Sequence, residues 1–201
     1  PNHNTLFIMP SAETNPKGSS YLSNYELLYM NVGHSFSDDL HVSLGFLFPI
    51  TSEFISHGPM TLGLKQRLLC EPEKYNVSLM GSYTFALAED YSLITFGGAI
   101  NYYTSPDFTF NFYLGDMLDP KANEINHLIN FGVGITARTG ESTKLIVEYL
   151  NGQIEDEIFD GIFLVGVRFF GKKLSVDLAG LAPLTGGEWF LWPFLNFTYH
   201  F

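Results

Sequence analysis

The sequence predicts an all-β protein, folded as a single antiparallel up-and-down transmembrane β-barrel of about twelve strands. Three observations support this: many apolar but few charged residues, apolar residues that alternate with polar ones, and short polar turns between the alternating runs. Hydrophobic residues make up 46% of the 201 residues, aromatic residues 16% and charged residues only 15%, against about 25% charged in an ordinary soluble domain. No apolar run reaches the roughly 18 residues of a membrane-spanning helix. No linker or shift in composition divides the chain, so residues 1–201 are expected to form one domain.

The alternation is clearest in the run around Val165. One face carries Phe163, Val165, Val167 and Phe169, and the other carries Leu164, Gly166 and Arg168. Because successive side chains of a strand point to opposite faces, such a run has one apolar face and one small or polar face. The same pattern recurs around Leu64, Val133, Val147 and Val176, so we expect a repeated strand of this kind.

Counting such runs gives twelve strands, with ten as the alternative if the first run and the run around Phe110 are not strands. Their expected centres are Phe7, Tyr29, Leu44, Leu64, Leu79, Phe96, Phe110, Val133, Val147, Val165, Val176 and Phe197. Amphipathic helices are the competing interpretation. Glycines inside the apolar runs disfavour helices, because each would cost a helix about 1 kcal/mol.

Two kinds of connection separate the runs. Five are tight polar turns: Ser37–Asp39, Glu71–Lys74, Thr104–Asp107, Thr139–Ser142 and Gly171–Lys173. The others are mostly longer: Pro10 to Ser20, Thr51 to Pro59, Gly115 to Asn126, Asn151 to Asp160 and Pro183 to Glu188, with the short Glu89–Asp90 as the exception. Short turns at one end and longer loops at the other are typical of outer-membrane barrels, in which the turns are periplasmic.

Alternation alone does not decide which face is inside. A soluble lipocalin-like carrier would bury the apolar face, whereas a membrane barrel would turn that face to lipid. The apolar face is broad and aromatic, the other face is rich in Gly, Ser, Thr and Asn, and Lys and Glu are scarce in mid-strand. These features favour the membrane barrel.

The C-terminus carries a further signal. Leu195, Phe197, Tyr199 and the final residue Phe201 share one strand face. This ending resembles the closing strand of bacterial outer-membrane β-barrels. The resemblance implies that Phe197, Tyr199 and Phe201 form a membrane-insertion signal read by the barrel-insertion machinery, on a strand expected to lie beside the one that starts near Thr5. It also implies an outer-membrane location, with membrane lipid and lipopolysaccharide as surroundings and other envelope proteins as further partners.

Segments at both ends of the chain resemble a group of uncharacterised outer-membrane barrel proteins. They are Leu6–Ala12, with Pro16–Gly18 after it, and Val165–Arg168, followed by Leu174–Asp177. This resemblance implies fold and location but no chemistry. Residues 1–4 lack the basic start and apolar stretch of a signal peptide, so we expect a mature chain from which such a peptide has been removed.

Eight charged residues are expected to point into the barrel: Glu26, Lys65, Arg67, Arg138, Lys144, Glu148, Arg168 and Asp177. Unpaired charges away from water would be very unfavourable, so these should pair with one another or stay hydrated. They could line a selective pore or form an internal ion-pair network that fills the barrel. Because small barrels are often filled by their own side chains, the second interpretation is favoured.

The expected outer loops are acidic and would form a mouth that attracts cations. Within them, Glu155, Asp156, Glu157 and Asp160 are a weak calcium candidate, because they offer hard oxygen ligands without the spacing of an EF-hand loop. No metal or cofactor is otherwise expected. The net charge of −11 argues against a nucleic-acid partner.

No catalytic motif is recognisable, and we expect no enzyme activity. The main hypothesis is a non-enzymatic structural or accessory barrel of an envelope assembly, with a largely filled lumen. The alternatives are a narrow solute or ion channel with an acidic mouth, a membrane-embedded lipid hydrolase using a Ser–His pair such as Ser43 with His41 or Ser35 with His34, and the soluble carrier.

Overall fold

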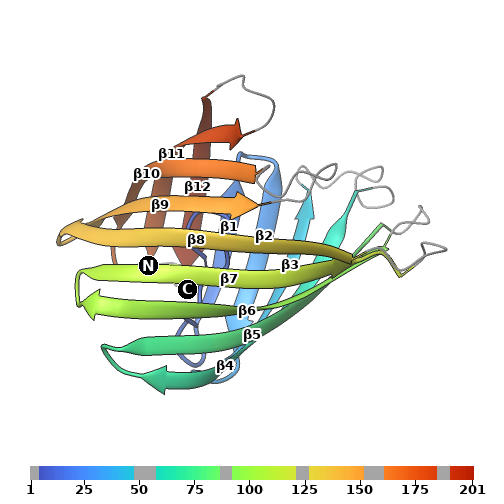
Figure 1. The fold of residues 1–201 in the computed structure, drawn as a ribbon, viewed down its shortest axis with the longest axis horizontal. Helices are drawn as coiled ribbons and strands as arrows, with labels where there is room; N and C mark the ends of the chain where they lie inside the picture. Colours follow the sequence, from blue (N-terminus) through green and yellow to red (C-terminus); the bar gives the residue numbers. More distant parts are fainter. Residues whose placement is uncertain (1–4, 48–57, 87–91, 121–126, 152–160, 185–190) are drawn as a thin grey trace.

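The computed structural model describes residues 5–47, 58–86, 92–120, 127–151, 161–184 and 191–201, and within them forms a closed barrel of twelve antiparallel strands (Figure 1). The strands are β1 Ser20–Tyr25, β2 Tyr29–Ser35, β3 Leu40–Leu47, β4 Met60–Glu71, β5 Tyr75–Phe85, β6 Ser92–Ser105, β7 Phe108–Leu118, β8 His127–Gly140, β9 Thr143–Asn151, β10 Gly161–Phe170, β11 Leu174–Leu184 and β12 Trp192–His200. The predicted all-β fold with twelve strands is confirmed. The described residues include no helix that is long and apolar enough to cross a membrane.

Each strand pairs with the next along the chain, and β12 pairs with β1 to close the barrel. The five predicted tight turns join β2 to β3, β4 to β5, β6 to β7, β8 to β9 and β10 to β11. Figure 1 shows the β4–β5, β6–β7 and β8–β9 turns together at the left end of the barrel. Most of the expected longer connections fall outside the described residues. All five tight turns lie at one end of the barrel, called here the tight-turn end, and the opposite end is called here the loop end.

One predicted strand is wrong. The segment around Phe7 is not part of the barrel wall: Leu6, Phe7, Met9 and Ala12 are all buried inside the barrel. Its apolar residues do not alternate, since Leu6 and Phe7 are neighbours and both are buried, and a wall strand has one side facing outward. The expected loop from Pro10 to Ser20 is likewise wrong, because Ser11 and Asn15 are also buried within the barrel.

The count of twelve survives because the chain from Ser20 to Ser35 makes two strands instead of one. They are joined by a tight turn in which the Leu28 N–H donates to the Tyr25 carbonyl, 3.0 Å away. Glu26 and Leu27 have φ angles of 53° and 60°, a conformation usually adopted by Asn or Gly in such turns. The closing strand accordingly lies beside β1 and not beside a strand starting near Thr5, with Phe201 N–H donating to the Ser20 carbonyl at 3.0 Å.

The two faces of the wall have opposite chemistry. Large apolar side chains point outward, as at Leu114, which is 63% exposed, while Glu148 on the inner face is fully buried. Other inward residues are small or polar, including Ser23, Ser78, Asn101 and Thr198. This is the inverse of a soluble barrel and matches a wall surrounded by lipid, so the soluble carrier is not supported.

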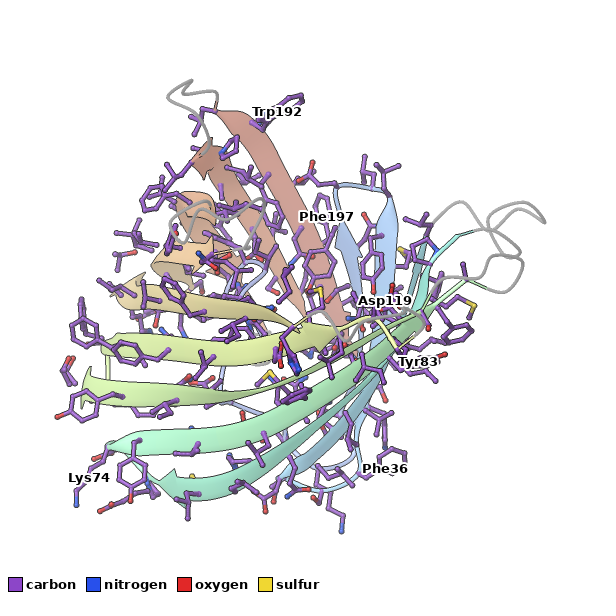
Figure 2. All side chains as sticks on the ribbon, turned by 45° about the vertical axis from the view of Figure 1, so that its right-hand side comes forward. Phe36, Lys74, Tyr83, Asp119, Trp192 and Phe197 are labelled. Atoms are coloured by element: carbon purple, nitrogen blue, oxygen red, sulfur yellow. The ribbon has the colours of Figure 1, made fainter. Side chains whose placement is uncertain are left out.

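Aromatic side chains also mark both ends of the outer surface. Phe36 lies at the tight-turn end, and Tyr83 lies at the loop end (Figure 2). Such belts are typical of membrane barrels, because an amphipathic ring suits the boundary between lipid and water.

Candidate functional site

Residues 5–15 occupy the lumen and are called here the plug segment. Near its start the segment turns back on itself: Thr5 and Pro10 form an antiparallel bridge, and the Leu6 N–H donates to the Met9 carbonyl at 2.9 Å. The chain leaves the barrel at the tight-turn end, where the Gly18 N–H donates to the Ser35 carbonyl at 2.7 Å. Main chain and apolar side chains of the same polypeptide therefore occupy part of the lumen.

Glu148 of β9 holds the turn of the plug segment. Its carboxylate accepts the backbone N–H groups of Phe7 and Ile8 at 2.9 Å each, and that of Met9 at 3.4 Å. Successive N–H groups that converge in this way form a small anion-binding concavity. A buried carboxylate is stable only when it is hydrogen-bonded or paired. The Glu148 carboxylate therefore depends on the plug segment for its donors, and the turn of the segment depends on this carboxylate as its acceptor.

An ion pair between β10 and β11 holds the start of the plug segment. Arg168 and Asp177 are opposite each other in the register, and the guanidinium donates to both carboxylate oxygens, through Nε at 2.6 Å and Nη2 at 2.9 Å. Arg168 also donates to the carbonyl of Thr5 at 3.1 Å and to that of Leu6. Asn196 of β12 donates to Asp177 at 2.9 Å. This bidentate geometry leaves both buried charges compensated.

The opposite wall holds the end of the plug segment. Lys65 of β4 donates from Nζ to the Ser11 carbonyl at 2.9 Å. On β6, the Asn101 side chain accepts the Ala12 N–H at 2.9 Å, and the Tyr103 hydroxyl donates to the Glu13 carboxylate at 2.8 Å. Glu13 therefore lies at the lumen wall, whereas the expected loop from Pro10 to Ser20 would have placed it outside the barrel.

The wall is also shaped to receive the apolar side chains of the plug segment. A Cβ added to Gly132 would lie 2.5 Å from Met9 Sδ, and one added to Gly134 would lie 2.4 Å from Leu6 Cδ2. The two glycines of β8 thus leave the space that Leu6 and Met9 fill. Phe7 packs on Phe194 of β12 with ring centroids 5.8 Å apart.

The eight sequence-predicted charges fall into three groups. Lys65, Glu148, Arg168 and Asp177 are buried at the inner wall and hold the plug segment directly or through one another. Lys144 also lies at the inner wall, where it borders a small space with Thr5, Leu6 and Glu13. The other three lie toward the two ends of the barrel.

At the tight-turn end, Arg67 pairs with Asp39 at 2.8 Å, and Arg138 donates to the Gly140 and Glu141 carbonyls at 3.1 and 2.9 Å. Glu26 does not line the lumen. It lies in the β1–β2 turn, where its carboxylate accepts the Leu195 N–H. The expectation that Glu26 points into the barrel is therefore wrong, because the residue lies in a turn and not on a wall strand.

Sequence reasoning missed the plug segment and the buried amides of the inner wall, of which Asn101 bonds the plug segment directly. Asn101, Asn111, Asn130 and Asn196 are all buried on the inner wall. Asparagines at inward strand positions were a usable signal, since buried amides need main-chain or side-chain partners. The buried stack of Tyr21 and His41, with centroids 5.3 Å apart, was not predicted either.

Some space remains beside the plug segment. A cavity of about 190 Å³ lies against β1–β7, bordered among others by Tyr21, Asn31, His41, Lys65 and Tyr113. The acidic candidate Glu155, Asp156, Glu157 and Asp160 lies outside the described residues. Within the described residues, no three His, Cys, Asp or Glu side chains form a group able to hold a metal ion.

Comparisons of the chain with known proteins give a fold but no family. No family model matches the chain, and no curated protein matches it. Among solved structures, the KdgM porin in complex with disordered oligogalacturonate superposes with a TM-score of 0.67 at 7% identity, covering 91% of this chain and 98% of that one. An outer membrane channel from Pseudomonas putida F1 superposes with a TM-score of 0.66 at 11% identity, covering 94% and 97%. The chain therefore has the fold of bacterial outer-membrane porins and channels.

Proposed function

We propose that this protein is a non-enzymatic bacterial outer-membrane barrel that its own plug segment closes, and that it serves as a structural or accessory component of the envelope. The observation that carries the proposal is the buried clamp on the plug segment by Glu148, Arg168 and Lys65. A segment held by charged groups on opposite walls occupies the path that a solute would take. The outward apolar face supports placement in lipid, with lipopolysaccharide, the insertion machinery and other envelope proteins as its expected surroundings.

Burial makes this occupation stable. Phe7 is fully buried, and burying a Phe side chain contributes about 1.5–3 kcal/mol. Opening the lumen would expose that ring and would leave Glu148, Arg168 and the plug carbonyls without their present partners. Each buried group left unsatisfied costs about 1–3 kcal/mol, so a closed lumen is the favoured state.

A narrow channel is the second candidate function. It is favoured by the cavity of about 190 Å³ beside the plug segment and by the shared fold with a porin and a channel. In this function Lys65 and Arg168 would act on permeating ions as well as on the plug segment.

The Ser–His arrangements do not favour a lipid hydrolase. Ser35 Oγ lies 3.1 Å from His41 Nδ1, and the other ring nitrogen of His41 lies 3.3 Å from the Tyr21 hydroxyl. Both ring nitrogens therefore meet hydroxyl groups, whereas a catalytic histidine is oriented by a carboxylate or amide on its far side. We expect purified protein to release no fatty acid from phospholipid, with or without Ca²⁺. Sustained release would overturn the non-enzymatic assignment.

Planar-bilayer recording separates the closed barrel from the channel. We expect the full chain to show almost no steady conductance and Glu148→Ala to show frequent openings, because three plug N–H groups then lose their acceptor. Glu141→Ala, an exposed change in the β8–β9 turn, is the matched control and should behave as the parent. Equal heat-modifiable migration on detergent gels would show that the variants fold alike.

If the unmodified chain shows steady conductance and Lys65→Ala alters its ion selectivity, the closed-barrel proposal is wrong and the channel is the better proposal. A silent Glu148→Ala barrel that still folds would show that the plug segment does not depend on Glu148, and it would overturn the clamp.

A further inference from the structure

A row of small residues crosses the inner wall from β3 to β6 and is called here the hydroxyl row. Four neighbouring strands contribute to it, in register, Ser43, Gly63, Ser82 and Thr95. The row faces the lumen, because Ser43 is two residues from the buried His41 on the same strand face. A Cβ added to Gly63 would lie 2.6 Å from Ser43 Oγ, so this glycine leaves the Ser43 hydroxyl uncovered.

The chain itself does not use the hydroxyl groups of this row. Within the part of the chain that the structure describes, the side chains of Ser43, Ser82 and Thr95 make no hydrogen bond, and all three are partly exposed. Nearer the loop end, by contrast, the hydroxyl oxygens of Thr61 and Thr84 lie 2.9 Å apart and bond each other. Each hydroxyl can donate one hydrogen bond and accept two. The hydroxyl row is therefore available to a molecule in the lumen.

The hydroxyl row borders the cavity of about 190 Å³ that lies beside the plug segment. Pro10 of the plug segment and Met80 of β5 add apolar surface, and Tyr21 and Tyr113 border the cavity from β1 and β7, at the two ends of this arc of wall. The volume equals that of about six water molecules at roughly 30 Å³ each. A single sugar ring with its hydroxyl groups needs a space of this size.

The charges around the cavity favour an uncharged molecule. No carboxylate side chain is among the described residues that border it, so a cation would meet Lys65 with nothing to balance either charge. Lys65 already donates to the carbonyls of Ser11 at 2.9 Å and Glu13 at 3.4 Å. Both ring nitrogens of His41 lie next to hydroxyl groups of the chain. The hydroxyl row, which both donates and accepts, is thus the main polar group left for a ligand.

We propose that this cavity binds one small, uncharged, polyhydroxylated molecule of monosaccharide size. Its hydroxyl groups would bond the hydroxyl row, and its C–H surface would lie against Met80 and Pro10. A molecule of this class both donates and accepts hydrogen bonds along its rim and is apolar across its ring, which matches the mixed lining of the cavity. The inference rests on the proposed closed barrel in one respect, because Thr5 and Pro10 of the plug segment form one side of the site.

Isothermal titration calorimetry of the full chain with glucose tests the proposal, in a zwitterionic detergent that has no sugar headgroup. We expect saturable heat with a Kd on the order of 1 mM, as suits so small a ligand. The double variant Ser43→Ala with Ser82→Ala should weaken binding by about tenfold, because two neutral hydrogen bonds are lost. Thr95→Val keeps the volume of the side chain and should weaken binding by about fivefold, and it serves if the double variant does not fold.

Ser78→Ala is the matched control, because Ser78 is a buried inner-wall serine of the same strand as Ser82 but does not border the cavity. It should leave the affinity for glucose unchanged. Heat-modifiable migration on detergent gels shows whether each variant folds.

Four outcomes would overturn the site. They are no saturable heat from a folded barrel, equal glucose affinity in the double variant, equal binding of cyclohexanol, which would make the site apolar, and much tighter binding of glucuronate, which would make it an anion site at Lys65. Each of these leaves the closed barrel intact if the unmodified chain stays silent in planar bilayers. Steady conductance of that chain would instead overturn the closed barrel, and with it the plug side of the site.

Discussion

At the scale of single residues, the lumen depends on a few charges whose partners come from distant parts of the chain. Alternation predicted that Lys65, Glu148, Arg168 and Asp177 would point inward, and all four are buried at the inner wall. Alternation could not reveal what they contact. Glu148 binds main chain about 140 residues away in sequence, and no local pattern contains that information.

The ion pair of Arg168 and Asp177 gives a stability prediction. We expect Arg168→Ala to lower the free energy of unfolding by about 3–5 kcal/mol, because Asp177 would remain buried without its cation. Urea unfolding in detergent micelles measures this change in unfolding free energy. Arg138→Ala, at an exposed arginine, should change stability by less than about 1 kcal/mol. The double variant Arg168→Ala with Asp177→Ala should recover part of the loss, and failure to recover any would mean that the pair is not coupled.

The β1–β2 turn gives a second prediction for single residues. Leu27 has a φ of 60°, where a side chain costs about 1–2 kcal/mol that glycine avoids. Because Leu27 is 62% exposed and loses little packing, we expect Leu27→Gly to raise the unfolding free energy by about 1 kcal/mol. Leu28 is 60% exposed but is not among the residues with positive φ. Leu28→Gly is therefore the control, and it should be neutral or destabilising in the same urea titration.

At the scale of elements, the first segment shows the limit of counting strands. Leu6–Met9 is as apolar as a strand, yet it folds inside the barrel, and β1 arises instead from a run that divides at Glu26–Leu28. The total of twelve was right although one member was wrong. A segment that is apolar on adjacent residues suits a fully buried place, whereas a wall strand needs one polar or small face toward the lumen.

The closing strand carries a prediction about assembly. Phe201 is exposed at the end of the chain, next to Tyr199, and their ring centroids are 6.3 Å apart. If this ending is read during insertion, Phe201→Ala should slow folding into lipid vesicles in the presence of the insertion machinery, as followed by heat-modifiable migration. Phe36→Ala removes another exposed aromatic ring at the same end and serves as the control. An equal delay in both variants would assign the effect to the aromatic belt and not to a terminal signal.

At the scale of the whole molecule, the barrel is polar inside and apolar outside, so lipid is the expected solvent of its outer surface. Leu114 lies within β7 and faces outward. In a membrane, Leu114→Arg should destabilise the barrel by about 2–4 kcal/mol, whereas Leu28→Arg, at the tip of the β1–β2 hairpin, should cost about 0–1 kcal/mol. Reversible unfolding in lipid vesicles measures both. Equal small effects would indicate that the outer face meets water.

The sequence by itself determined the strand periodicity, the five tight turns and the chemistry of the two faces of the wall strands, because each depends only on neighbouring positions along the chain. It also favoured a filled lumen over an open pore, on the ground that small barrels are often filled by their own side chains. Only the tertiary structure decided which segment enters the lumen and which strand closes the barrel against β12. Those features follow from register and closure, which bring together residues far apart in sequence, and a period of two residues carries no information about such distances.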